Sequence, residues 1–145
     1  MNDFIKLNGI SILYALMMFI PLELMVNVYR INRLTDWGIG IINATILMII
    51  LIEAVAGTLL FLYLIKRWLS VRKINYWSVV LWIPYFFLFV YAFAALFPIT
   101  YGGDRPNPAT GLIILGGLML YPFYILFLTS FGMVTNHDNA LESGG

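Results

Sequence analysis

The sequence predicts an all-α integral membrane protein, an up-down bundle of four transmembrane helices. Four long apolar runs fill most of the 145 residues, short loops separate them, and only 10% of the residues are charged. Ordinary soluble domains contain roughly 25% charged residues, and a soluble domain of this length must keep a largely polar surface. The composition therefore fits a protein whose solvent is mostly lipid.

Each predicted span is about 20 residues or longer, enough at 1.5 Å per residue to cross a hydrocarbon core of about 30 Å. The first apolar run is too long for the core of a signal peptide, so we expect it to be retained. The spans are residues 7–29, 39–64, 77–97 and 111–133. Short loops make consecutive helices antiparallel neighbours, and residues 1–134 form one transmembrane domain.

The polar segment that follows, residues 135–145, is expected to be disordered. Its last residues resemble a cloning linker.

Basic residues predict the orientation in the membrane. Five lie at the N-terminus and in the second loop, and three lie in the first and third loops: Lys6, Lys66, Arg67, Arg72 and Lys73 against Arg30, Arg33 and Arg105. Cytoplasmic loops carry an excess of lysine and arginine. We therefore expect both termini in the cytoplasm and the protein in a plasma (inner) membrane.

Composition also argues against several classes of function. A net charge of +1 provides no global field for nucleic acid. The absence of cysteine excludes disulfides and thiolate metal sites. His137 is the only histidine, so no metal site is expected, and no motif indicates a cofactor.

The residues that could carry chemistry are two glutamates inside the spans, Glu23 and Glu53. An ionised side chain near the bilayer centre costs roughly 2.5–3.5 kcal/mol, so each needs a partner, water or a proton. Glu23, Asn27 and Arg30 fall at i, i+4 and i+7, which places them on one helix face. We expect that face to point inward.

Counting 1.5 Å per residue places Glu23 about 9 Å and Glu53 about 18 Å below the external boundary. Candidate phenol partners lie at the same depths: Tyr91 for Glu23, and Tyr85, Tyr121 or Tyr124 for Glu53. Asn27 and Asn43 share a shallower layer and could hydrogen-bond between the first two helices.

The leading hypothesis is that the protein, as an oligomer, binds or transports a small ligand or ion through an outward-opening polar cavity. One or both glutamates would change protonation as the ligand passes. The structural alternative is that a protonated glutamate bonded to a tyrosine fastens two helices, typically for about 0.6 kcal/mol.

Two further hypotheses are a non-catalytic accessory or assembly subunit that docks on a larger membrane protein, and an enzyme acting on a lipid or isoprenoid. The enzyme would need a Glu53–tyrosine pair as proton donor and acceptor. It is the weakest hypothesis because the spans contain no histidine, no Ser-His-Asp set and no metal ligands beyond carboxylates.

Overall fold

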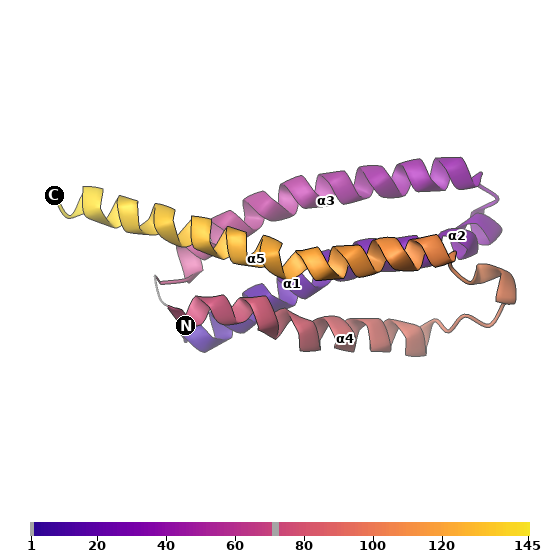
Figure 1. Ribbon diagram of the computed structural model, residues 1–145, viewed down its shortest axis with the longest axis horizontal. Coiled ribbons are helices and arrows are strands. Elements are labelled where there is room, and N and C mark those ends of the chain that lie inside the picture. Colours follow the sequence, from indigo (N-terminus) through magenta and orange to yellow (C-terminus); the bar gives the residue numbers. More distant parts are fainter. Residues whose placement is uncertain (1, 71–72) are drawn as a thin grey trace.

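A computed structural model of the protein describes residues 2–70 and 73–145. Four long helices lie side by side, α1 (Asp3–Val26), α3 (Ile39–Trp68), α4 (Ser78–Leu96) and α5 (Pro108–Ser143) (Figure 1). The short elements are α2 (Val28–Thr35) and two 3₁₀ turns, η1 (Lys73–Trp77) and η2 (Gly102–Asp104). With η1 counted at the start of α4, all four are long and apolar enough to cross a membrane. The predicted class, an all-α protein with four membrane-spanning helices, is confirmed.

Short polar residues set several helix ends. The Asn2 side chain accepts a hydrogen bond from the Phe4 N–H (3.2 Å) at the start of α1. The Asn107 side chain does the same for Ala109 (2.9 Å), with Pro108 as the first residue of α5. Both are N-caps that satisfy backbone donors otherwise left free in the first turn. Asp36, with φ of 55°, ends α2 and turns the chain into α3.

Some boundaries differ from the prediction. The loop expected between the first two spans contains α2, separated from α1 only by Asn27. The segment expected to be a disordered tail is helical, because α5 continues to Ser143. No glycine or proline interrupts the chain between Met133 and Ser143, so nothing stops the helix earlier. Arg72, one of the basic residues used to predict orientation, lies outside the described residues.

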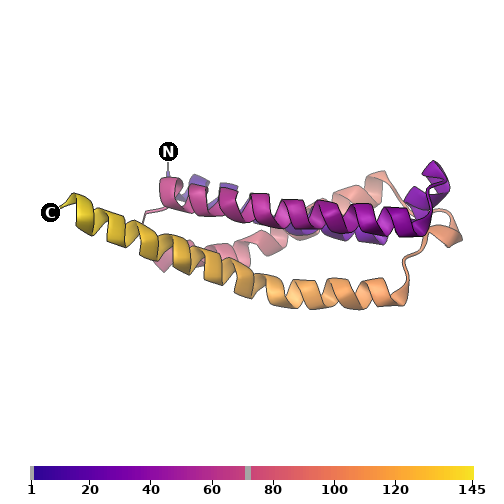
Figure 2. The ribbon, with the colours of Figure 1, turned by 90° about the horizontal axis from the view of Figure 1, so that it is seen from above.

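Helix α1 lies at the centre and packs against α3, α4 and α5. In Figure 1, α3 and α4 lie on opposite sides of α1, and Figure 2 shows α5 on a different side from α3. The expectation that all consecutive helices are packed neighbours is therefore wrong for α3 and α4. We call the end where α1 begins and α5 ends the terminal end, and the end with α2 and η2 the loop end.

The core lies toward the terminal end and is built from aromatic rings. Tyr14 of α1 stacks on Phe61 of α3 with ring centroids 4.1 Å apart. Trp82 of α4 meets Tyr121 of α5 edge to face at 4.9 Å. The Tyr121 hydroxyl donates to the Tyr14 backbone carbonyl (2.6 Å). One buried cluster thus joins all four long helices.

Toward the loop end the helices bury much less. Along α3 and α5 most apolar side chains are exposed, among them Leu47, Met48, Leu112 and Met119. In a bilayer these faces contact lipid, which is as apolar as the side chains themselves.

Close packing at the terminal end makes one glycine critical. A Cβ atom added at Gly132 of α5 would lie 2.6 Å from Cγ2 of Ile65 in α3. We predict that Gly132→Ala lowers stability by about 1–3 kcal/mol through overpacking. At Gly116 an added Cβ meets nothing within 4 Å, so Gly116→Ala is the control. Thermal unfolding in detergent measures both, and equal effects of the two changes would contradict this packing.

Candidate functional site

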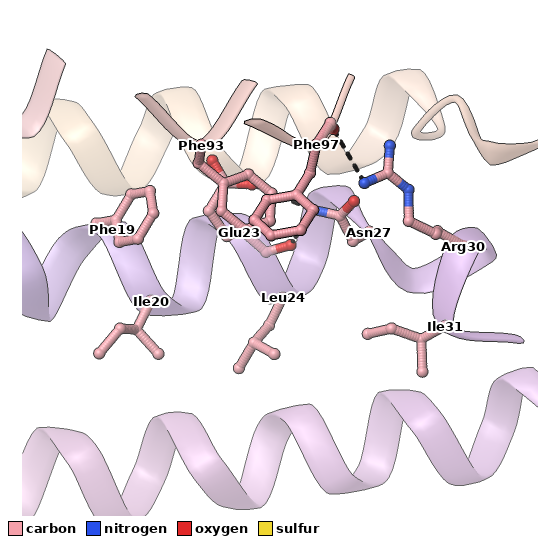
Figure 3. A pocket seen from close by; sticks show the side chains of 9 residues that line it. All are labelled: Phe19, Ile20, Glu23, Leu24, Asn27, Arg30, Ile31, Phe93 and Phe97. Carbon is pink, nitrogen blue, oxygen red and sulfur yellow. Dashed lines mark hydrogen bonds between the residues drawn. The ribbon is translucent and has the colours of Figure 1, made fainter. Parts of the chain in front are cut away.

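A cavity of about 380 Å³ lies on α1 toward the loop end. Figure 3 shows Ile20, Leu24 and Ile31 pointing from α1 and α2 toward α3. The aromatic side chains Phe19 of α1, Phe93 of α4 and Phe97 just after α4 form another part of the wall. The polar residues that line the cavity are Glu23, Asn27 and Arg30. The predicted inward face with i, i+4, i+7 spacing thus lines one cavity.

Asn27 orders the Glu23 side chain. Its Nδ2 donates to the Glu23 carboxylate at Oε2 (3.1 Å) and to the Glu23 backbone carbonyl (2.8 Å). Asn27 is buried, with 8% of its surface exposed, and it is also where α1 ends. Both bonds come from the amide nitrogen of Asn27, so the polar atom of this side chain that remains for another partner is its carbonyl oxygen, an acceptor.

Arg30 is bound by the chain that follows α4. Its Nη1 donates to the Phe97 backbone carbonyl (3.1 Å, Figure 3). Its Nη2 donates to the Pro98 backbone carbonyl (3.1 Å). These are carbonyls at the C-terminal end of α4, where a positive charge is favourable. Arg30 therefore ties α2 to α4 and forms the loop-end wall of the cavity.

A second arginine closes the loop end. Arg33 of α2 donates from Nε and Nη2 to the two carboxylate oxygens of Asp104 (3.0 and 2.7 Å). Nε of Arg30 lies 3.8 Å from the same carboxylate. Asp104 is only 2% exposed, and its hydrogen bonds from Arg33 hold its pKa below the ordinary value for aspartate. We call Arg30, Arg33 and Asp104 the latch.

Glu53 lines a separate cavity of about 310 Å³ between α1 and α3. The other lining residues are apolar: Leu13, Leu16, Met17, Ile20, Ala56, Gly57, Leu60 and Phe61. The carboxyl oxygen Oε2 is buried and has no hydrogen-bond partner in the described part of the chain. The two glutamates therefore do not share one polar cavity, although Ile20 lines both cavities.

The phenols expected beside Glu53 bond to other groups. Tyr85 donates to Asn8 Oδ1 (2.6 Å), Tyr121 to the Tyr14 carbonyl (2.6 Å), and Tyr124 pairs with the Thr58 hydroxyl (2.6 Å). Tyr91, expected beside Glu23, is 74% exposed. These predicted pairings are wrong because counting residues from the helix ends gives the depth of a side chain in the membrane. It does not give the direction in which the side chain points around its helix. Phe93, two residues after Tyr91, faces Glu23 instead.

Asn43 is also not where the sequence suggested. Its side chain is exposed on α3, whereas Asn27 is buried against Glu23. Sequence reasoning missed the latch as well. Arg33 and Asp104 are 71 positions apart, and no local spacing signals such a pair.

Comparison of the chain with protein-family models, curated proteins and solved structures finds no match. Within residues 2–70 and 73–145, no three His, Cys, Asp or Glu side chains lie together in a way that could hold a metal ion.

We predict that Asp104→Asn loosens the loop end, because the neutral amide cannot keep the paired ionic contact with Arg33. Hydrogen exchange in residues 98–107 should speed up, and the melting temperature should fall. Arg33→Gln should do the same, and the double variant should lose less than the sum of the two. Arg105→Gln, at an exposed loop arginine with no ion pair among the described residues, is the control.

The sign of the pH dependence follows from the lowered pKa of Asp104. The stabilisation by the latch should be complete above the ordinary aspartate pKa, about 3.9. It should disappear as the pH falls through the lower value in the folded protein. If Arg33 did not contact Asp104, the melting temperatures of wild type and Asp104→Asn would keep the same difference throughout an acid titration.

Replacing Glu53 tests the cost of its unpaired oxygen. We predict that Glu53→Met, which keeps the length of the side chain, raises stability by about 1 kcal/mol, because a buried group without a partner is removed. Glu23→Met should instead lower stability, because it removes the bond from Asn27. Unfolding in the same detergent compares the two. A destabilised Glu53→Met protein would mean that Glu53 has a partner after all.

Proposed function

We propose that this protein binds a small hydrophobic amine within the membrane, at Glu23. The observation that carries the proposal is the nature of the Glu23 cavity. Its walls are aromatic and aliphatic, and two hydrogen-bond acceptors line it, the Glu23 carboxylate and the Asn27 side-chain carbonyl. Beside them lies Arg30, whose Nη1 and Nη2 bind the Phe97 and Pro98 carbonyls.

The acceptors are the Glu23 carboxylate and the Asn27 side-chain carbonyl. One Glu23 oxygen already accepts from Asn27, and the other can accept from a ligand. The donors of Arg30 that face α4 are occupied by the Phe97 and Pro98 carbonyls. A site that offers acceptors favours a ligand that brings donors, and an ammonium group brings three.

The aromatic wall also favours a cation. Phe19 lies edge to face with Phe93 at 6.0 Å, and Phe93 lies 5.0 Å from Phe97. Ring faces attract ammonium groups, by about 0.5–2 kcal/mol depending on desolvation. An alkyl body on the amine would contact Ile20, Leu24 and Ile31, which line the same cavity.

Orientation places this site in one half of the bilayer. Five of the eight basic residues lie at the N-terminus and in the loop between α3 and α4, so we place the terminal end in the cytoplasm. In a plasma (inner) membrane, the Glu23 cavity would then lie in the outer half. The ligand would reach it sideways from the lipid, between α3 and α4.

The earlier hypothesis of transport placed both glutamates in one polar pathway. The two cavities are separate, so we restrict the proposal to binding. Transport would need a second arrangement of α3 and α4 around α1 that opens the site toward the terminal end.

An assembly role is the second candidate, and one observation favours it. The loop-end halves of α3 and α5 leave small residues open, since added Cβ atoms at Gly40, Gly111 and Gly116 meet nothing within 4 Å. Small residues let membrane helices approach closely. A second copy of this chain or a larger membrane protein could pack there.

Binding of dodecylamine to the protein in lipid nanodiscs tests the proposal, with empty nanodiscs as the measure of partitioning into lipid. We expect Glu23→Gln to weaken binding by at least about tenfold, because a charge-assisted hydrogen bond is lost. Dodecanol, which lacks the positive charge, should bind weakly to both proteins. Asn43→Ala changes an exposed amide on α3 and should leave the affinity unchanged.

Two results would count against the proposal. One is a wild-type protein that takes up no more dodecylamine than empty nanodiscs, which would favour the assembly role. The other is binding that Glu23→Gln leaves intact, which would place the amine elsewhere.

A further inference from the structure

The two cavities on α1 are adjacent. Ile20 lines both the cavity of Glu23 and the cavity of Glu53. Leu13 and Met17 lie on α1 between Ile20 and the terminal end, and they line the second cavity. Leu24 lies on the loop-end side of Ile20 and lines the first cavity. These positions are three or four apart, so they form one stripe along the helix. A ligand that extends along this stripe would pass from one cavity into the other at Ile20.

The second cavity contains one unsatisfied polar group. Oε2 of Glu53 is buried without a hydrogen-bond partner in the parts of the chain that the structure describes. The α1 side chains that face Glu53 are Leu13, Leu16, Met17 and Ile20, none of which can donate. No donor from the described residues reaches Oε2, and a ligand in the cavity can supply a donor to the part of the Glu53 carboxyl group that lines it.

The junction between the two cavities is open to the side. Ile20, which lines both cavities, is 42% exposed. Ile20 and Leu24 point into the space between α1 and α3 in Figure 3. No charged side chain other than Glu53 lines the second cavity. The part of the ligand that connects its two polar groups must therefore be apolar.

We propose that the ligand is two-headed, with an amine at Glu23, an apolar chain past Ile20, and a second hydrogen-bond donor at Glu53. This inference rests on the proposed amine site and adds the chemistry of the ligand's other end. The second donor is a hydroxyl or another amine, since either can donate to a carboxyl oxygen. No covalent step is involved.

The test compares alkylamines with their ω-hydroxyl derivatives, from hexyl to tetradecyl, in nanodiscs. For at least one chain length, the hydroxyl should improve binding to wild type relative to Glu53→Met, by up to roughly tenfold. The plain amines should bind Glu53→Met at least as well as wild type, because they place no donor at Glu53. Each compound is compared between the two proteins, so differences among compounds in partitioning into the nanodisc lipid cancel. ω-Aminoalkylamines of the same lengths show whether a charged ammonium group binds at Glu53 more tightly than a neutral hydroxyl.

A second variant tests the path between the heads. Ile20→Trp should block the junction and remove the advantage of the ω-hydroxyl amine over the plain amine of the same length, with both compounds measured on this variant. Because Ile20 also lines the Glu23 cavity, the readout is this ratio and not the amine affinity itself. Ile113→Trp, at an exposed position of α5, is the matched control. The variants are independent of each other, so a folding failure of one leaves the other as a test.

The outcomes separate the two proposals. In one outcome, plain amines bind through Glu23 while the ω-hydroxyl compounds bind wild type no better than Glu53→Met at every chain length. That result would overturn the two-headed ligand and leave the amine site standing. A hydroxyl gain that survives Ile20→Trp would overturn the path past Ile20. Failure of every amine to bind would remove both.

Discussion

The position of α1 is the constraint on which the rest of this structure depends. α1 packs against the other three long helices, and α3 and α4 lie on opposite sides of it (Figure 1). Near the terminal end, the Tyr14 ring stacks on Phe61 and the Tyr14 carbonyl accepts from Tyr121. The Glu53 cavity lies along α1 beside that core, and the Glu23 cavity lies further toward the loop end. A bundle with α3 and α4 in contact would bury this face of α1 and have no such site.

The loop end is held by charge where the terminal end is held by packing. Arg33 and Asp104 connect α2 to the segment between α4 and α5, and Arg30 binds the carbonyls that follow α4. These contacts lie at the ends of the spans, where water is near, so each charge is less costly than in the bilayer centre. They also occupy Nη1 and Nη2 of Arg30, which forms no ion pair with Glu23 among the described residues. Without them, the guanidinium could neutralise the carboxylate that we assign to the ligand.

The sequence predicts the spans well because length and hydropathy decide whether a segment can cross a bilayer. It also places Glu23, Asn27 and Arg30 on one face, since their spacing is a property of a single helix. It fails where a contact depends on how helices are arranged. Tyr91 was expected beside Glu23 by depth alone, yet it is exposed, and Phe93 lines the cavity. The pairing of Arg33 with Asp104 likewise depends on a loop returning to α2, which no local pattern encodes.

The two glutamates differ in how the protein satisfies them, and this difference bears on function. Glu23 accepts a hydrogen bond from Asn27, the residue that ends its own helix, so a structural role could account for its presence. Among the described residues, Oε2 of Glu53 is buried without a hydrogen-bond partner, and its neighbours on α1 are apolar. Natural proteins accept locally unfavourable groups mainly at functional sites. On this ground we propose that Glu53, an intramembrane acid in the wall of a cavity, serves a ligand rather than helix packing.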